Sequence, residues 1–491
     1  ITSDKMFHDM KRRRAVRAAT LAIISTATIA LLTTSQQPGA ILLHRRSKFP
    51  SASLLTTSKP LRLSRTACLS QKRLYPSVPN DEFVLVDKDL KQLIDQDCFD
   101  FDIGPEARVP SPLVSPPLLD YVQPATIDIP ISGPVHLLKE RVLPFRQNLS
   151  NLLPALTLQQ WDFGDNEEGV LLLKGQSYLI RCGKVTLPSG CRGVLSPKSS
   201  IGRIDVMVRS VVDGCGLYDV IPEYTAATAD GVQGSQCAEL WVEVTPRSFN
   251  VRIYRGLALT QLMILSSSKN GFDLSNDDNE EEKGNGEVSR SDGAMPPLLY
   301  GDDEKEIPLN LHNGMIILGI RVPRTHGEII GYEAISTSDV VDLKRVSGHS
   351  HKDFFRPISY YGSENGGRLV LEKDRFYILC IKERVAVPKE FSAEMIPFSH
   401  NIGELRAHYA GFFDPGFGID EHGGLKGSNG VLEVRPHETV TIYDGQPICL
   451  MQFFRNRCVP EKPYGTTALG SHYQGQTGPW LAKYFAKPEE T

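Results

Sequence analysis

The stretch Pro197-Lys198-Ser199-Ser200-Ile201-Gly202-Arg203, which follows Ser196, has an altered counterpart in the second half of the chain. That counterpart is Pro397-Phe398-Ser399-His400-Asn401-Ile402-Gly403-Glu404, which has one inserted residue. The first copy gathers two cations, hydroxyl groups and backbone N–H groups beside a glycine, a combination that can surround a phosphate. Taken alone, such a loop is also typical of a solvated turn. In the second copy phenylalanine replaces the lysine and glutamate replaces the arginine, and a carboxylate there would repel a phosphate. We therefore expect only the first copy to bind phosphate.

The two copies lie within a longer internal repeat. The matching segments, in the same order in both halves, are Tyr178–Ile180 with Tyr377–Leu379, Val185–Pro188 with Val385–Pro388, Glu243–Pro246 with Glu433–Pro436, and Val251–Gly256 with Val440–Gly445. The spacing from Pro188 to Pro197 also equals the spacing from Pro388 to Pro397. Ordered matches of this kind indicate duplication of one module.

Composition indicates the fold class of that module. The 491 residues include 33 Pro and 41 Gly, with many short runs rich in Val, Ile, Leu and Tyr, which favours a mainly β protein with a few short helices. This length is sufficient for two or three domains. The net charge of -4 does not indicate a nucleic-acid or membrane-surface protein, so we expect small molecules or other protein chains as partners.

The N-terminal region, residues 1–80, differs from the rest of the chain. From Met10 to Asn80 there is no Asp or Glu, and a basic cluster precedes an apolar run from Ala18 to Leu32. This pattern predicts a targeting segment, with a plastid or mitochondrion as the destination and the cytoplasm as the alternative. A single membrane anchor is the other interpretation, but the run is short for a span and contains Ser and Thr. We expect no stable membrane association of the mature chain.

We divide the remaining chain into a first module at 81–266, an acidic linker or loop at 267–297, and a second module with a C-terminal tail at 298–491. The linker assignment rests on the run of Asn, Asp and Glu from Asn276 to Glu282. Such a segment has too little apolar surface to order itself.

Several motifs occur in order along the two modules. They are Gln123-Pro124-Ala125-Thr126-Ile127-Asp128, Lys198–Arg203, Trp241–Val244, Pro246–Phe249, His408–Gly418 with its Asp414-Pro415-Gly416 hairpin, Val431–Val434, Tyr464-Gly465 and Tyr473–Gln476. From about Asp81 to Phe485 the chain resembles the two-module form of the deoxycytidine triphosphate (dCTP) deaminase family, which shares its fold with the trimeric dUTPases.

The resemblance implies tandem dUTPase-like distorted β-barrel modules, a homo-oligomer that is a trimer or another multiple of three modules, and active sites where modules meet. The phosphate contacts that it implies are Lys198, Ser199, Ser200, Arg203, Tyr464 and Gln476. Ser199 and Arg203 would also hold the attacking water. The aspartate that frames the pyrimidine would be Asp219 in the first half and Asp414 in the second, and the proton-handling glutamate would be Glu243 or Glu433.

Neither half contains every part of the implied site. The first half has the intact loop but a loose hairpin around Asp219, whereas the second has the sharp hairpin at Asp414 and the altered loop. Either first modules of several chains pair with one another, or first-half loops pair with second-half hairpins. We favour Glu243 over Glu433 by a small margin. The glutamate that is not used would be a surface strand residue or a member of a structural ion pair.

The implied reaction converts dCTP to dUTP and ammonia, which feeds dUMP and thymidylate synthesis. Zinc deaminases use an H-x-E…P-C-x-x-C signature; this chain has His326-Gly327-Glu328, but its nine Cys include no C-x-x-C pair. We therefore expect no protein-bound metal, a partly buried glutamate as the base, and Mg²⁺ bound to the triphosphate.

Three alternatives remain for the function. A dUTP diphosphohydrolase and a bifunctional dCTP deaminase and dUTPase are possible on the same fold. The third is a non-catalytic, nucleotide-binding regulatory protein that retained the loop but not turnover.

Overall fold

The computed structural model describes residues 82–102, 117–141, 143–144, 148–163, 168–223, 237–267, 298–323, 325–360, 367–397, 411–420, 423–424, 426–466 and 473–487. These residues belong to one compact unit, Lys72–Thr491. The targeting segment expected at 1–80, the linker after Ser267 and the altered loop after Pro397 lie outside the described residues. No described helix is long and apolar enough to cross a membrane.

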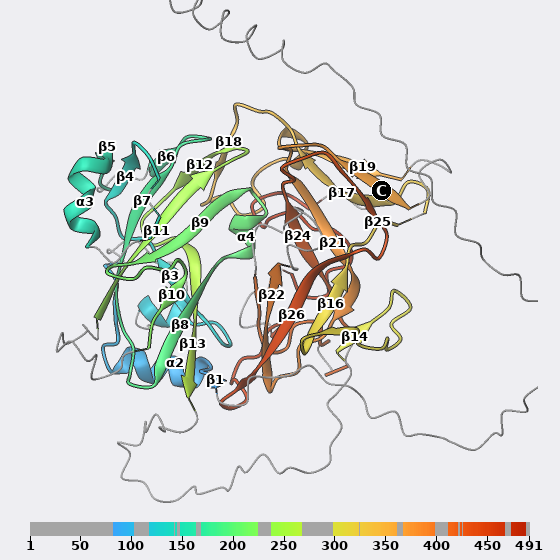
Figure 1. The fold of residues 1–491 in the computed structure, drawn as a ribbon, viewed down its shortest axis with the longest axis horizontal. Helices are drawn as coiled ribbons and strands as arrows, with labels where there is room; N and C mark the ends of the chain where they lie inside the picture. The colour runs from blue at the N-terminus through green and yellow to red at the C-terminus, as the bar shows by residue number, and fades with distance from the viewer. Residues whose placement is uncertain are drawn as a thin grey trace, which may run out of the picture. The chain divides into compact units, whose positions relative to one another are not determined.

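The first module is built mainly from strands (Figure 1). They are β1 (Glu82–Val84), β2 (Phe99–Asp100), β3 (Ile127–Pro130), β4 (Val135–Leu138), β5 (Thr157–Trp161), β6 (Val170–Leu172), β7 (Tyr178–Thr186), β8 (Cys191–Pro197), β9 (Val206–Val212), β10 (Val220–Ile221), β11 (Cys237–Pro246), β12 (Asn250–Ile253) and β13 (Ala258–Ser267). The short helices are α2 (Asp87–Asp95), η1 (Pro117–Tyr121), α3 (Leu149–Leu156) and α4 (Ser199–Gly202). The sheet β5-β4-β7-β11-β9 and the strands β3, β13, β8 and β10 contribute to one hydrophobic core.

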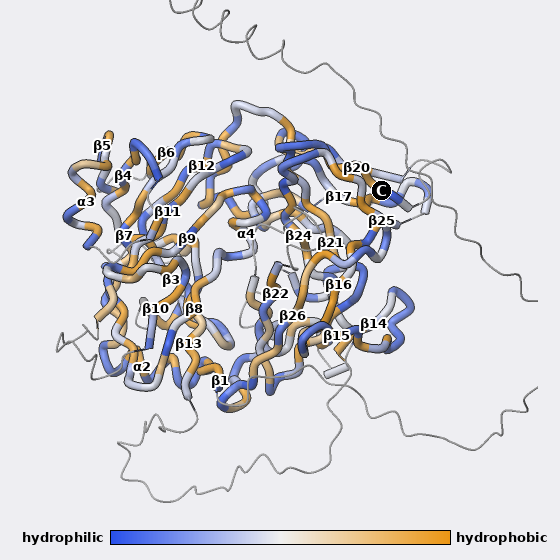
Figure 2. Tube along the Cα trace, in the orientation of Figure 1, coloured by the Kyte–Doolittle hydropathy of each residue, from blue (hydrophilic) through white to orange (hydrophobic). Residues whose placement is uncertain are grey.

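The second module is also mainly β. Its described strands are β14 (Leu299–Tyr300), β15 (Leu311–His312), β16 (Met315–Gly319), β17 (Ile329–Ala334), β18 (Val340–Asp342), β19 (Phe355–Ser359), β20 (Arg368–Leu371), β21 (Tyr377–Val385), β22 (Phe391–Pro397), β23 (Phe412–Phe413), β24 (Ser428–Val434), β25 (Val440–Tyr443) and β26 (Pro447–Asn456), and a helical turn η3 spans His351–Asp353. The strands carry most of the hydrophobic residues, while hydrophilic residues concentrate in the loops (Figure 2). The predicted mainly β fold of two barrel-like modules is confirmed.

Strand register shows that the modules are copies of one another. On β11, Glu243 lies opposite Leu179 of β7, and on β24, Glu433 lies opposite Ile378 of β21. A local device recurs too, because the hydroxyls of Tyr178 and Tyr377 each accept a hydrogen bond from the backbone N–H five residues earlier in the chain. The two glutamates therefore occupy equivalent places in their modules.

Backbone pairing joins the two modules. β1 pairs antiparallel with β13 of the first module and parallel with β26 of the second, and β12 pairs parallel with β18. The core of the first module extends across the boundary, where Phe249 meets Phe354 and Phe355 edge to face at 5.3 Å between ring centroids. This interface holds α4 of the first module against the second, beside β24 (Figure 1).

Candidate active site

A cavity of about 430 Å³ lies where the modules meet, and both contribute to its lining. The first module supplies the loop that begins at Pro197, together with Asp128. The second module supplies an aromatic wall, two carboxylates and the tail. The lining residues used below are Asp128, Lys198, Ser199, Ser200, Arg203, Gly411, Phe413, Asp414, Phe417, Glu433, Tyr464, Tyr473, Gln476 and Lys483. Of the two arrangements left open by the sequence, this cavity combines a first-half loop with a second-half hairpin.

Arg203 is held in place by the C-terminal tail. One terminal nitrogen donates to the side-chain oxygen of Gln476 at 3.2 Å and to the backbone carbonyl of Trp480 at 2.9 Å. The guanidinium carbon lies 3.8 Å from the centre of the Tyr473 ring, a cation–π geometry. Arg203 is buried, and its Nε has no hydrogen-bond partner among the described residues. A cation fixed in this way, with one N–H still unbonded, can stabilise an anion that forms in the cavity.

The carboxylate of Glu433 faces this arginine from β24. Its Oε1 lies 3.9 Å from Arg203 Nε, and both side chains are almost completely buried. Burial raises the pKa of Glu433 to about 8, although the nearby Arg203 charge opposes the rise. A carboxyl group with a pKa near neutral can both accept and return a proton.

The Asp414-Pro415-Gly416 hairpin places a second carboxyl group in the cavity. The Ala125 N–H of the first module donates to Asp414, whose pKa burial raises to about 7, with a further contribution from Asp128. Gly416 has φ +100°, and a Cβ there would lie 2.8 Å from the Tyr464 carbonyl oxygen, so the turn needs glycine. Beyond it, Phe417 contacts Phe413 at 5.0 Å and Tyr464 at 5.8 Å between ring centroids. This aromatic wall suits a flat ring.

The remaining loop residues lie at the same cavity. Lys198 forms an ion pair with Asp128. Ser199 lines the cavity opposite Gly411, where a Cβ would lie 3.5 Å from the serine Oγ. Ser200 is buried and hydrogen-bonded to the Tyr484 hydroxyl. The structure thus brings together Lys198, Ser199, Ser200, Arg203, Asp414, Glu433, Tyr464 and Gln476.

Glu243 lies elsewhere. It forms an ion pair with Arg141, and the Tyr218 hydroxyl lies 3.5 Å from its other oxygen. Burial raises its pKa, and Arg141 partly offsets this. Leucines of α3 pack beside it on Trp241. We favoured Glu243 from the sequence, but the cavity contains Glu433 instead. Glu243 forms the structural ion pair that we expected of the unused glutamate.

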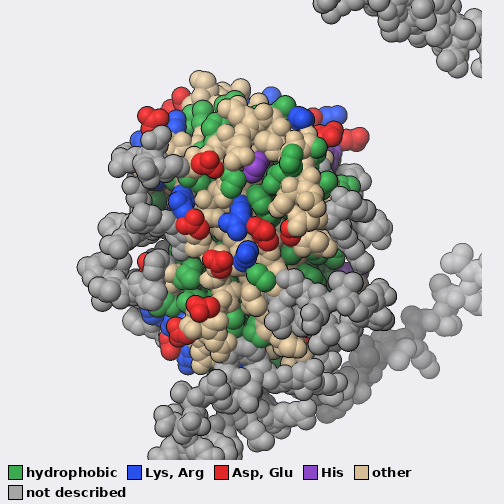
Figure 3. Space-filling model, turned by 90° about the vertical axis from the view of Figure 1, so that its left-hand side faces the viewer, with side chains coloured by type: hydrophobic (Ala, Val, Ile, Leu, Met, Phe, Trp, Pro, Cys, Tyr) green, Lys and Arg blue, Asp and Glu red, His purple; other side chains and the backbone are tan. Residues whose placement is uncertain are grey.

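Asp219 is also outside the cavity. It pairs with Arg209. Figure 3 shows the face of the molecule on the side of the first module, where acidic and basic side chains lie next to one another. Strand register corrects its expected equivalence to Asp414. Val220 opposes Val194, as Phe412 opposes Glu394, so the counterpart of Asp414 is Pro222. The position equivalent to Asp414 therefore lies three residues after Asp219 in the first module.

Known protein families match both modules. Residues 114–268 match the N-terminal domain, and residues 294–485 the C-terminal domain, of 2'-deoxycytidine 5'-triphosphate deaminase. The chain belongs to the dCTP deaminase family. A crystal structure of 2'-deoxycytidine 5'-triphosphate deaminase from Agrobacterium tumefaciens is similar with a TM-score of 0.59 and 26% sequence identity, over 78% of this chain and 97% of that one.

Curated relatives in this dCTP deaminase family match a shorter region. A protein of Leifsonia xyli subsp. xyli is 34% identical over 118 residues, which is 24% of this chain and 55% of the relative. One of Beutenbergia cavernae is 33% identical over 124 residues, or 25% of this chain and 61% of the relative. Both are named "dCTP deaminase, dUMP-forming". The chain therefore spans less than two thirds of the length of these relatives.

Three contributors to the cavity were not selected from sequence. Tyr473 stacks on Arg203, Asp128 pairs with Lys198, and Lys483 lines the cavity from the tail. Tyr473 and Asp128 fall within motifs quoted above, and a charge-balance argument for Lys198 could have identified Asp128. Lys483 carries no local signal, because only the path of the tail brings it to the loop.

Proposed function

We propose that the protein is a hydrolytic dCTP deaminase that converts dCTP and water to dUTP and ammonia. The observation that carries the proposal is the buried Glu433 facing Arg203 across the module boundary, at a cavity that also contains Lys198 and an aromatic wall. These groups offer a proton carrier, a cation for developing negative charge, a phosphate-binding end and a surface for the pyrimidine. Family membership supports the same substrate.

In the proposed reaction, Ser199 and Arg203 hold a water molecule beside C4 of cytosine. Ionised Glu433 takes a proton from the water as its oxygen bonds to C4, and then passes a proton to ring N3. The amino nitrogen gains a proton, the C4–N bond breaks with its electron pair leaving on ammonia, and the C4–OH proton is lost to leave the carbonyl. One water is consumed and one ammonia released. Glu433 ends as it began.

Mg²⁺ is proposed to arrive on the triphosphate, because it favours phosphate oxygens and its own waters. Among the described residues no group of three or more His, Cys, Asp or Glu side chains could hold a metal ion. The residues proposed for the phosphate end are Lys198, Ser199 and Ser200, with Tyr464 and Gln476 on the tail side of the cavity. The product would feed dUMP and thymidylate synthesis.

A bifunctional enzyme that also releases pyrophosphate is the second candidate, favoured by the "dUMP-forming" names of the relatives. The test incubates the full chain with dCTP and Mg²⁺ and follows ammonia and pyrophosphate separately. Ammonia with accumulating dUTP supports the deaminase, and ammonia with pyrophosphate supports the bifunctional enzyme. dCTP binding with neither product would exclude both and favour a regulatory binding protein.

The pH dependence of the reaction is the next prediction. Since Glu433 must be ionised to accept the water proton, and its pKa lies at about 8, kcat/KM should fall roughly tenfold per pH unit below that value. Measuring kcat/KM at fixed free Mg²⁺ from acid to alkaline pH gives the midpoint. The affinity of Glu433→Gln for dCTP over the same range controls for ionisation of the substrate. A rate that is flat down to the ordinary glutamate pKa contradicts the assignment.

Two further properties remain proposals. Assembly in multiples of three modules is testable by the mass of the particle in solution at several concentrations.

Import into a plastid or mitochondrion is testable by fusing residues 1–80 to a fluorescent reporter, with a cytoplasmic signal as the contrary result.

A further inference from the structure

We propose that Lys483, on the C-terminal tail, binds the terminal phosphates of the substrate and makes the site selective for nucleoside triphosphates over monophosphates. The inference deepens the proposed function and rests on it. Lys483 lines the active-site cavity together with Lys198, Ser199 and Arg203.

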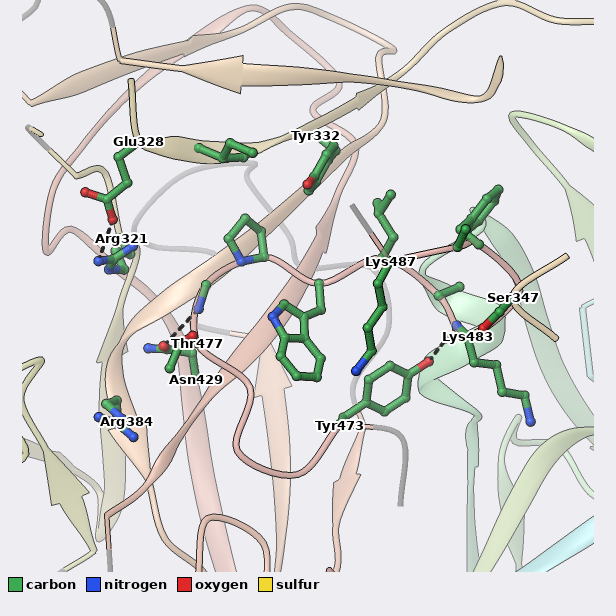
Figure 4. A pocket seen from close by; sticks show the side chains of 18 of the residues that line it. Arg321, Glu328, Tyr332, Ser347, Arg384, Asn429, Tyr473, Thr477, Lys483 and Lys487 are labelled. Atoms are coloured by element: carbon green, nitrogen blue, oxygen red, sulfur yellow. Dashed lines mark hydrogen bonds and ion pairs between the residues drawn. The ribbon is translucent and has the colours of Figure 1, made fainter. Parts of the chain in front are cut away.

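The backbone of Lys483 is fixed on both sides. Its N–H donates to the Tyr473 hydroxyl at 3.3 Å, a bond drawn in Figure 4, and its carbonyl accepts from the Ser347 N–H at 2.8 Å. The next residues are held as well, since His349 N–H donates to the Tyr484 carbonyl at 3.1 Å and Ala486 N–H donates to the His349 carbonyl at 2.9 Å. The backbone of Lys483 is therefore ordered before a ligand binds, which lowers the entropy lost on binding.

The charge balance around Lys483 favours an anion. No carboxylate of the described residues lies within ion-pair distance of its ammonium group. Burial lowers the pKa of Lys483, and the largest effect of a neighbouring charge comes from the cation Lys198, which lowers it further. Asp128 offsets this only partly, because it is paired with Lys198. Both lysines line the same cavity, where their ammonium groups repel one another, and a polyphosphate between them would remove that repulsion.

The chain offers a matched control four residues further along the tail. Lys487 is exposed and lies 4.9 Å from the centre of the Trp480 ring. It lines a second cavity of about 900 Å³, whose lining also includes Tyr473 and Lys483. Figure 4 shows this second cavity, where Lys487 extends toward Tyr473. The two lysines share a segment, a charge and this second cavity, but of the two only Lys483 also lines the active-site cavity.

The experiment compares full-length Lys483→Met, Lys483→Arg and Lys487→Met with the wild type. A charge-assisted hydrogen bond to phosphate corresponds to about 10- to 100-fold in affinity, so Lys483→Met should raise KM for dCTP by that factor with kcat little changed. Inhibition by inorganic tripolyphosphate should weaken equally, while inhibition by dCMP should not. Lys483→Arg should restore most of the affinity, and Lys487→Met should match the wild type.

An unchanged KM in a folded Lys483→Met, or equal weakening for tripolyphosphate and dCMP, would overturn the inference while leaving the deaminase intact. Calorimetric titration with tripolyphosphate and dCMP gives the same comparison without turnover. It therefore still tests Lys483 if the wild type releases no ammonia and the proposed function fails. Should Lys483→Met not fold, Lys483→Gln takes its place in both measurements.

Discussion

Glu433→Gln should lower kcat for dCTP deamination by roughly 10²- to 10⁴-fold and leave dCTP affinity close to that of the wild type. Glutamine keeps the size of the side chain, but it cannot take a proton from water. Because Arg203 and the tail remain, the phosphate end of the cavity is unaffected. The measurement pairs ammonia release under saturating dCTP with calorimetric dCTP binding.

Glu243→Gln is the matched control, since both glutamates occupy the same register position in their modules. Glu243 is paired with Arg141 outside the cavity, so its substitution should alter stability more than turnover. If Glu243→Gln loses activity while Glu433→Gln keeps it, the catalytic assignment is reversed and the active site is built around the first-module strand.

The buried carboxyl also links catalysis to stability. The folded-state pKa of Glu433, about 8, lies above its ordinary value of 4.5, so the folded state holds this proton more tightly than the unfolded chain. The resulting stabilisation is complete below the unfolded pKa and is lost as pH rises through about 8. Glutamine does not ionise, so Glu433→Gln should not lose stability in this way as pH rises, and it should be more stable than the wild type at alkaline pH. Unfolding curves of Glu433→Gln and the wild type, measured at acid and at alkaline pH, would show whether the variant is inactive because it cannot move the proton or because it misfolds.

The internal repeat was sufficient to predict two copies of one module, because duplication leaves matched residues at matched spacings. Strand register reproduces the alignment at Tyr178 with Tyr377, and at Glu243 with Glu433. It departs at Asp219, because the register places Pro222, three residues later, at the position of Asp414. Spacing aligns paired strands reliably, because side chains alternate between the two faces of a sheet. A shift of one residue would move every side chain of the strand to the other face. Connections between strands tolerate insertions, so residues within them cannot be aligned from spacing alone.

The residues of the site could be predicted from the sequence, but the contact between Arg203 and Glu433 could not. Sequence identified Arg203 and Glu433 separately and left open which glutamate the loop would meet. That choice depends on how the modules pack, which is decided by contacts spread over β1, β12 and β18 rather than by any one motif. The contacts that hold Arg203 likewise depend on the path of the tail, because they come from Tyr473, Gln476 and Trp480.

Arg435→Met should destabilise the folded chain by about 3–5 kcal/mol, because it leaves the buried Asp205 carboxylate without its cation. Asp205 follows Arg203 by two residues, as Arg435 follows Glu433 by two. The Asp205–Arg435 ion pair therefore lies beside the Arg203–Glu433 contact, across the same module boundary. Ser248 completes it, donating to Asp205 at 2.6 Å and accepting from Arg435 at 2.9 Å. Denaturant unfolding gives the change in stability, and kcat/KM should fall as Arg203 and Glu433 lose their alignment.

The double variant Asp205→Asn with Arg435→Met separates the loss of a partner from the loss of the contact. Asparagine tolerates the left-handed backbone of this position, φ +56°, and carries no charge to leave unpaired, so much of the lost stability should return. Lys91→Met removes an exposed ion pair with Glu461 that also joins the modules and should cost about 1 kcal/mol or less. If Arg435→Met costs no more than Lys91→Met, the buried pair does not anchor the boundary, and the geometry of Arg203 and Glu433 must depend on the tail alone.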